Sequence, residues 1–446
     1  MRKKSMALLM AMTLTASLLT GCASTNQENG VPAESSSETA AGQTEAGNEA
    51  DGSISLVWAT FKGEWVDLLN EVFAEYKKDH PEIKEITVYT AASGSGNLFT
   101  DLKVMLASNT MPNIVNMRAD SFGYAWKEYL QDISDSEAVK ATKEEFVEPF
   151  QWDGGTYGVY WNYEVQGVMW NIKMLADLGI NKVPTTLTEY KATLDAAKAA
   201  GITPLIVPYG TSVRMYNFWG VLPLCLYGSY KDNFNKLVSG EIDPVTDEAW
   251  NTYYDLLDLD LSYAQANPIQ TDDNAANIAF CANEYLAYPS TGNQLAVIAK
   301  EYNPDFAETY RVGPLCPDDE NACYPLSVQG YSVTNTGDEA TNKAARELLD
   351  WFCTSDYVSE KFAREASVLR TSKTFEVTES MYDAMTYDAY VKSTEITVHP
   401  VRYYLGDDLN NEWAAVTQKY LAGELTREEA LAATGEAFRT YGTQVK

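Results

Sequence analysis

The stretch that decides the fold is DGGTYGVYWNYEVQGVMWNIKMLADLGI, residues 153–180. After an Asp-Gly-Gly turn, residues 157–161 have the period-2 pattern of a β-strand. A second β-rich run, residues 163–170, ends at Asn171, a good N-cap for a short helix that stops at Gly179. No Pro-rich or Gly-rich linker precedes this stretch. We interpret it as extended backbone that crosses from one globular half of the chain to another, a hinge lined with aromatic rings.

The length and composition agree with two halves. The chain has 446 residues, of which 45% are hydrophobic. That is too long for one ordinary hydrophobic core and long enough for two. We therefore expect two lobes, one on each side of the crossing.

The pattern before the crossing is that of a parallel sheet. Strand and helix patterns alternate along it, and the ligands of such sheets bind at the carboxyl ends of the strands. Those ends are expected near residues 58–61, in the Gly/Ser loop 93–97, and at 118–121. The strands are predicted at residues 54–59, 86–89 and 114–117, and the helices at 64–79 and 98–108.

Beyond the crossing, helix signals dominate. Two capping boxes, Thr186 with Glu189 and Thr426 with Glu429, are typical of helix starts. The other predicted elements are strands at 202–207, 283–289 and 327–334, a return crossing at 312–315, an aromatic helix-like run at 216–219, and a helix at 340–353.

The N-terminus has the features of a secretory signal. Residues 2–4 are basic, residues 6–14 are apolar, and the run is too short to span a membrane. The order Leu-Thr-Gly-Cys at residues 19–22 closely resembles a bacterial lipobox, in which Cys22 is acylated and becomes the new N-terminus. An ordinary signal peptide with an incidental Cys is the alternative. Acyl chains on Cys22 would hold the protein on the outer face of the cell membrane without spanning it.

Residues 23–52 contain almost nothing that a core could bury, and we predict a disordered tether there. The formal net charge of the whole chain is −30. Such a surface repels nucleic acid and anionic headgroups, so neither is an expected partner.

The cysteine and histidine content predicts no metal site and no cofactor. Besides Cys22 there are five cysteines, an odd number, without a CxxC motif or a Cys/His cluster, and the only histidines are His80 and His399. Cys316 and Cys323 could bridge a loop, and buried free thiols are the alternative. The disulfide state of these five stays open: Cys225, Cys281, Cys316, Cys323 and Cys353.

The order of these features resembles the extracellular solute-binding proteins of ABC transporters, in the carbohydrate-binding family that includes maltodextrin-binding protein. The resemblance runs from about residue 53 to the end. Its most specific pieces are Met-Pro-Asn-Ile-Val at 111–115 leading to Asp120, Tyr-Gly-Val at 157–159 followed by Val-Met-Trp-Asn at 168–171, and the segment 175–187.

The resemblance implies an α/β fold of the type II periplasmic-binding-protein kind, with two lobes joined by β-type hinge crossings and sugar bound in the cleft between them. We place the boundaries accordingly: signal peptide 1–22, tether 23–52, lobe 1 at 53–161 plus 314–356, and lobe 2 at 162–313 plus 357–446.

Sugar recognition needs flat apolar rings for the C–H faces and planar polar groups for the hydroxyls. Carried onto this sequence, the family's site residues fall at Trp58, Asp120, Glu164, Tyr216, Trp219 and Tyr331. To these we add Trp161 at the crossing, Asn293 in the turn 290–294, and Arg402. Core packing is the alternative for every ring, a solvated or helix-capping carboxylate for Asp120 and Glu164, and an interlobe salt bridge for Arg402.

These observations favour a monomeric, lipid-anchored extracellular receptor that captures a sugar or oligosaccharide and delivers it to an ABC permease, without catalysis. A secreted glycoside hydrolase would also use carboxylates beside aromatic rings, but the strand order lacks the eight βα repeats of a barrel. A third hypothesis is a receptor for a non-sugar solute such as a peptide or a polyamine.

Overall fold

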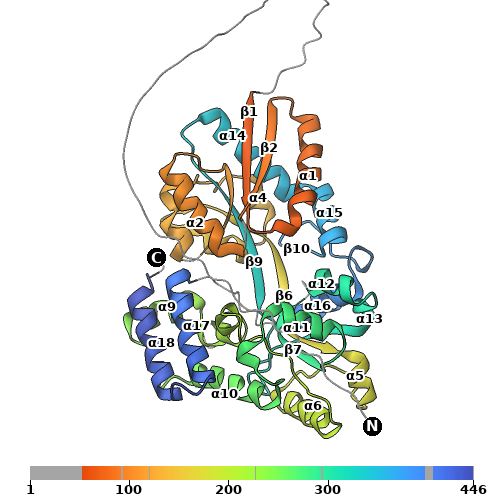
Figure 1. Cartoon of the computed structure of the whole chain (residues 1–446). Coiled ribbons are helices and arrows are strands. Elements are labelled where there is room, and N and C mark those ends of the chain that lie inside the picture. Colours follow the sequence, from red (N-terminus) through yellow and green to blue (C-terminus); the bar gives the residue numbers. More distant parts are fainter. Residues whose placement is uncertain are drawn as a thin grey trace, which may run out of the picture. The chain divides into compact units, whose positions relative to one another are not determined.

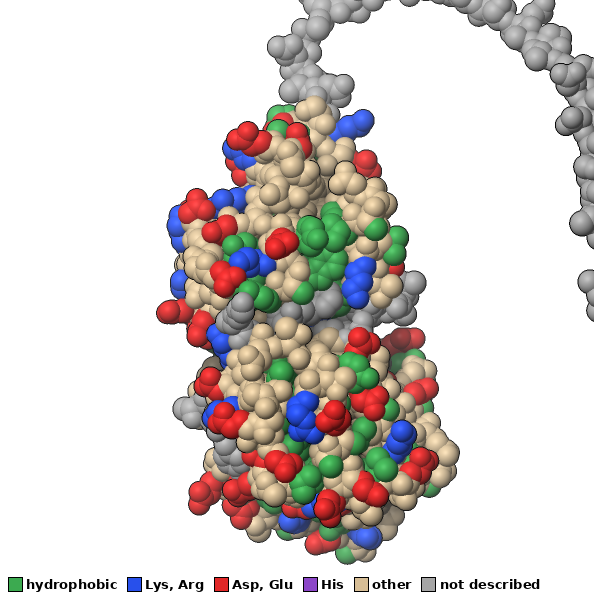
Figure 2. All heavy atoms as spheres, turned by 90° about the vertical axis from the view of Figure 1, so that its left-hand side faces the viewer, with side chains coloured by type: hydrophobic (Ala, Val, Ile, Leu, Met, Phe, Trp, Pro, Cys, Tyr) green, Lys and Arg blue, Asp and Glu red, His purple; other side chains and the backbone are tan. Residues whose placement is uncertain are grey.

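The computed structural model describes residues 53–91, 94–119, 121–226, 228–292, 295–396 and 405–444. It confirms an α/β fold with two lobes, joined by long strands (Figure 1). Within the described ranges, each helix is too short or too polar to cross a bilayer. Figure 2 shows acidic side chains spread over both lobes on the face it presents, as the net charge of −30 predicts.

The sheet of lobe 1 has the order β10-β6-β9-β3-β1-β2. Its parallel part is the predicted alternation of strand and helix: α1 joins the neighbours β1 and β2, and α2 returns the chain from β2 to β3 on the other side of β1. The elements are β1 (Ile54–Thr60), α1 (Val66–Asp79), β2 (Ile83–Thr90), α2 (Gly94–Ala107) and β3 (Ile114–Met117).

The crossing is one strand, β6 (Val159–Asn171), where the sequence suggested two runs. Its first half pairs with β9 (Leu326–Val333) and β10 (Leu369–Arg370), and its second half with β7 (Ala287–Gly292) and β8 (Tyr310–Gly313). The register shifts twice along the strand, between residues 160 and 162 and between 167 and 168. One continuous strand therefore belongs to the sheets of both lobes. The exact lobe boundaries stay predictions.

Phe150 is wedged between two glycines on neighbouring strands. A Cβ on Gly158 would lie 2.6 Å from Phe150 Cδ1, and a Cβ on Gly330 would lie 2.5 Å from Phe150 Cζ. The ring also packs edge-on against Tyr160, with centroids 4.9 Å apart. Both glycines are thus required by packing, because any larger side chain would displace the ring.

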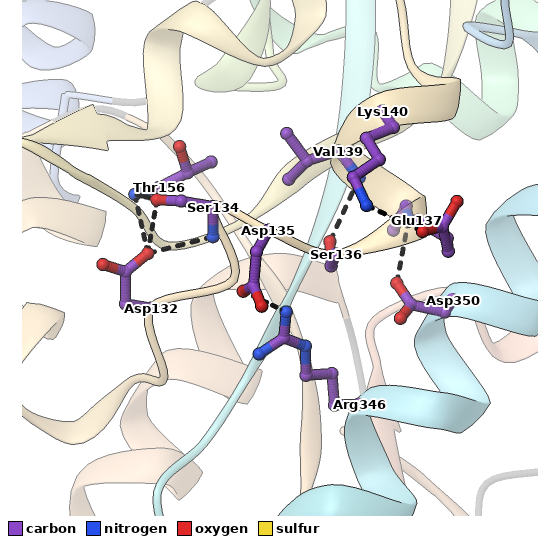
Figure 3. Close-up of polar contacts among 11 residues, drawn as sticks. Asp132, Ser134, Asp135, Ser136, Glu137, Val139, Lys140, Thr156, Arg346 and Asp350 are labelled. Atoms are coloured by element: carbon purple, nitrogen blue, oxygen red, sulfur yellow. Dashed lines mark hydrogen bonds and ion pairs between the residues drawn. The ribbon is translucent and has the colours of Figure 1, made fainter.

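One face of the lobe 1 sheet is covered by α1, α14 (Glu339–Thr354) and α15 (Asp356–Ala366), which pack over a single hydrophobic cluster. Polar contacts of the segment 132–138 connect this layer to the hairpin of β4 (Gln151–Trp152) and β5 (Gly155–Thr156) (Figure 3). Asp132 accepts a hydrogen bond from the Thr156 N–H at 3.2 Å, Arg346 of α14 pairs with Asp135, and Asp350 caps the first turn of α4 (Glu137–Ala141).

Lobe 2 is mainly helical around its own hydrophobic cluster. The predicted strand at 202–207 is wrong: Leu205 makes only isolated bridges, to Ala264 and Ala287. Pro204 and Pro208 flank it, and a proline has no N–H to donate to a ladder. The main helices are α5 (Ile172–Asp177), α6 (Leu187–Ala199), α9 (Tyr230–Ser239), α10 (Glu248–Tyr263), α16 (Ala384–Thr394), α17 (Asp407–Leu421) and α18 (Arg427–Tyr441).

The helix-start predictions are confirmed with one difference. Asn171 caps α5, and Thr426 with Glu429 forms a complete capping box at α18. At α6, Thr186 accepts from the Glu189 N–H, but the Glu189 carboxylate accepts from the Thr185 N–H instead of Thr186. The box there is shifted by one residue.

No disulfide joins the five described cysteines, and all but Cys225 are buried. The remaining elements are η1 (Gly63–Trp65), α3 (Ser121–Ala125), η2 (Lys127–Tyr129), η3 (Glu144–Phe146), η4 (Glu148–Phe150), α7 (Val213–Asn217), η5 (Trp219–Val221), α8 (Leu222–Cys225), η6 (Pro268–Gln270), α11 (Asp273–Cys281), α12 (Leu295–Tyr302), α13 (Phe306–Thr309) and η7 (Glu379–Met381).

Candidate functional site

A buried carboxylate lies in the middle of the crossing strand. Glu164 is only 5% exposed, and its neighbours along β6 are mostly apolar. Two polar side chains from other parts of the chain, one in a loop and one on a strand, contact it. Lys62, in the loop after β1, places its Nζ 3.6 Å from Glu164 Oε1, and Gln329 of β9 donates from Nε2 to the same oxygen at 3.2 Å.

Lys62 is shared between two carboxylates. Its Nζ also lies 3.2 Å from Oε1 of Glu64 and 5.2 Å from the centroid of the Trp65 ring. The Glu64 side chain is half exposed, whereas those of Lys62 and Glu164 are buried. The ammonium group therefore lies between an exposed and a buried carboxylate, and it helps to offset the cost of burying Glu164.

The carboxyl edge of the parallel strands presents a second cation. The guanidinium carbon of Arg118, just after β3, lies 5.6 Å from the centroid of the Phe61 ring and 5.8 Å from that of Phe99. Phe61 follows β1 directly, and Phe99 belongs to α2. Cations held over ring faces are a usual arrangement at such an edge. Hydrogen-bonding groups and apolar faces thus occur together where α/β sheets bind their ligands.

Three of the proposed rings lie in the interior of lobe 1. Trp58 and Tyr331 are fully buried and Trp161 is 1% exposed. The Trp58 ring centroid is 4.6 Å from that of Tyr331, and the Trp161 centroid is 4.6 Å from that of Phe352 in α14. These rings point toward the helix-covered face of the sheet, and core packing explains them. Their role as ligand contacts stays a prediction, and their burial does not support it.

Trp219 lies in the core of lobe 2, separate from the other two tryptophans. Its Nε1 donates to Asp260 Oδ2 at 2.7 Å, and the hydroxyls of Tyr209 and Tyr190 donate to the same carboxylate at 2.7 Å and 3.1 Å. Burial raises the pKa of Asp260 to about 6, against the opposing effect of these three donors. Trp219 therefore anchors a buried carboxylate.

Tyr216 is the most accessible of the predicted lobe 2 residues that the structure describes. It lies in α7, is half-buried, and its ring centroid is 6.3 Å from that of Trp413. Arg214 in the same helix pairs with Asp273, with its Nε 2.7 Å from Oδ1. The short helix α7 therefore carries an aromatic ring and a paired guanidinium.

Comparison with known proteins identifies the family. Residues 71–423 match the profile of the bacterial extracellular solute-binding proteins. The chain belongs to this family. We found no curated protein sequence of significant similarity.

Solved structures share the fold of this solute-binding protein at low sequence identity. They include RafE in complex with raffinose (TM-score 0.70, 16% identity, 87% of this chain and 99% of that one) and a chitin oligosaccharide binding protein (0.73, 17%, 88% and 99%). A third is a sugar transporter protein from Bacillus licheniformis in complex with stachyose (0.65, 16%, 86% and 98%). These likenesses confirm the two-lobed type II fold.

Several predicted positions of this solute-binding protein are not covered. Asp120, Asn293 and Arg402 lie outside the described residues, as does Cys22. Their roles stay predictions. Among the side chains that the structure does describe, no group of three or more His, Cys, Asp or Glu could hold a metal ion.

Sequence reasoning missed Lys62 and Gln329. Lys62 directly follows the predicted strand end at 58–61, and Gln329 is two residues before Tyr331. Neither carries a signal of its own, because Gln329 reaches Glu164 across 165 residues of chain. The register of β6 against β9 brings Gln329 to Glu164, and the order of the strands in the sheet brings Lys62 there.

Proposed function

We propose that this protein is a lipid-anchored extracellular receptor that captures a sugar or oligosaccharide between its lobes and delivers it to an ABC permease in the membrane. The observation that carries the proposal is its likeness in fold to proteins solved with raffinose and stachyose, together with its membership of the solute-binding family.

The described side chains suit this ligand class. Lys62 and Glu164 offer a donor and an acceptor for hydroxyls, and Phe61 offers an apolar ring beside Arg118. Such a mixture of a few placed polar groups and apolar surface is what saccharides need. We propose that these residues form the lobe 1 and hinge part of the site.

The anchor and the partner are further parts of the proposal. The Leu-Thr-Gly-Cys run supports acylation at Cys22, and residues 23–52 would then be a tether that lets the body move near the membrane. We propose the permease as the partner because the chain belongs to the extracellular solute-binding family. We propose that this chain likewise binds without catalysis and acts as a monomer.

The test is a titration of the purified protein, followed by intrinsic Trp fluorescence. The probes are raffinose, stachyose, chitin oligosaccharides and xylo-oligosaccharides, with a polyamine and a short peptide as non-sugar comparisons. We expect a saturable change with at least one saccharide. A response to the polyamine or the peptide alone would overturn the proposal, and release of new reducing ends would favour a hydrolase.

A further inference from the structure

Gln329 lies at the centre of the crossing but has no role in the function proposed so far. It belongs to β9, is 4% exposed, and donates its amide N–H to Glu164 at 3.2 Å. Its Cα partner on β6 is Asn162, which is fully buried. Residues directly opposite on paired strands place their side chains on the same face, so the two amides are neighbours.

The two amides have unused hydrogen-bonding capacity. Gln329 Oε1 and both Oδ1 and Nδ2 of Asn162 have no hydrogen-bond partner in the described part of the chain. Nearly all buried polar groups in native proteins are hydrogen-bonded, to protein or to ordered water. Three unsatisfied atoms on two facing residues are therefore a polar cluster between β6 and β9 that the described protein groups do not satisfy.

Burying an amide at position 329 costs free energy unless the amide is hydrogen-bonded. A methionine has about the same volume and would fill the position without the cost of desolvating an amide. The contact that Gln329 makes with protein is the hydrogen bond to Glu164. Hydrogen bonds to a charged group are stronger than neutral ones and fix the direction of the group. Gln329 is thus suited to hold the carboxylate in one orientation beside Lys62.

We propose that Gln329 is a positioning residue for ligand binding: supported by its neighbour Asn162, it fixes the Glu164 carboxylate so that the carboxylate meets the ligand in one orientation. This inference rests on the proposed function, because it assigns Glu164 to the ligand site. It adds two residues that do not themselves touch the ligand.

The first test measures saccharide affinity and thermal stability side by side. We expect Gln329→Met to weaken binding of the saccharide identified by titration roughly tenfold, the scale of losing a hydrogen bond to a charged group. In a Glu164→Gln background the same substitution should change affinity by less than twofold, because the carboxylate that Gln329 orients is already gone. Losses that multiply, or an unchanged affinity in Gln329→Met, would overturn the inference.

A matched control separates positioning from general packing. Gln131 also lies in lobe 1 and donates from Nε2 to the Thr334 carbonyl at 2.9 Å, without contact to the crossing carboxylate. Gln131→Met should lower the melting temperature and leave the saccharide affinity unchanged. If it weakens binding as much as Gln329→Met does, the effect is structural and the inference fails.

A second variant tests the contact without any ligand. In Gln329→Glu two carboxylates meet within hydrogen-bond distance and cannot both be charged in the interior, so one proton is retained. Its melting temperature should fall, relative to the wild type, as the pH rises from about 5 to about 8. If no saccharide of the panel binds, the proposed function is overturned. If the difference in melting temperature between Gln329→Glu and the wild type does not change with pH, the positioning role is overturned.

Discussion

Gly167 of β6 lies so close to Gly313 of β8 that a Cβ on Gly167 would be 2.0 Å from the Gly313 carbonyl oxygen. The register of β6 against β7 shifts between Gly167 and Val168, so this contact coincides with an irregularity of the crossing strand. The clash would be with backbone, which cannot rotate out of the way. The crossing thus depends on a residue without a side chain at this point.

Gly167→Ala should therefore destabilise the protein, by about 1–3 kcal/mol or more. The free energy of unfolding in urea measures this. Gly63→Ala is the control, because its Cβ would meet Thr90 Oγ1 at an ordinary 3.7 Å. Equal stability of the two variants would contradict the close approach.

The buried pair of Lys62 and Glu164 predicts an asymmetric response to substitution. Lys62→Met removes the ammonium group beside the buried Glu164 carboxylate and should cost about 3 kcal/mol of stability. Adding Glu164→Gln should recover part of that cost, because no charge is then left in the interior. Urea unfolding of the two single variants and the double variant gives the coupling. Additive losses would show that the two side chains do not interact.

Asp260 predicts a pH-dependent contribution to stability. Its pKa in the folded protein is raised from 3.8 to about 6 by burial. The folded state therefore binds the proton more tightly than the unfolded state, so this contribution is fully present below about pH 3.8 and is lost as the pH rises through about 6. The loss is on the order of 3 kcal/mol.

The measurement is the difference in unfolding free energy between the wild type and Asp260→Asn at each pH. The difference should fall as the pH rises from 4 to 7 and level off above, since other carboxylates affect both proteins alike. A flat difference would show that Asp260 titrates as it does in the unfolded chain.

Arg370 predicts a site where lysine cannot replace arginine. Its guanidinium is buried, donates to the Cys353 carbonyl at 3.0 Å and to Ser359 Oγ at 2.7 Å, and lies 4.2 Å from the Trp161 ring centroid. A lysine cannot match this planar set of donors. We expect Arg370→Lys to cost about 2 kcal/mol in thermal or urea unfolding, and Arg364→Lys, at an exposed position, less than about 0.5 kcal/mol.

The cysteines should be inert in the native protein. Burial raises the pKa of Cys225, Cys316 and Cys353 to about 12 and that of Cys281 to about 11, and it raises the pKa of Cys323 further. Thiolate is the reactive form, so little of it exists at pH 8. A protein with Cys22 replaced by Ser should show no fast reaction with a thiol reagent when folded and five reactive thiols in denaturant. Fewer than five would reveal a disulfide.

Local patterns in the sequence were enough for the elements of lobe 1 and for several helix starts. The alternation of strands and helices before residue 120 and the caps at Asn171 and Thr426 depend only on residues close in the chain. The same reasoning failed at 202–207. There the apolar run looked like a strand, but its flanking prolines and the absence of a partner ladder left it as irregular chain.

Length, composition and short-range periodicity predicted the two lobes and the crossing, and the order of motifs resembled the family that the profile match then identified. Only the tertiary structure decided which face of the sheet the rings of Trp58 and Trp161 enter, and which side chains meet Glu164. Alternation along a strand defines two faces without saying which one the helices cover. The register shift between residues 160 and 162 and the pairing of β6 with β9 are long-range choices, and they bring Gln329 and Lys62 to one carboxylate.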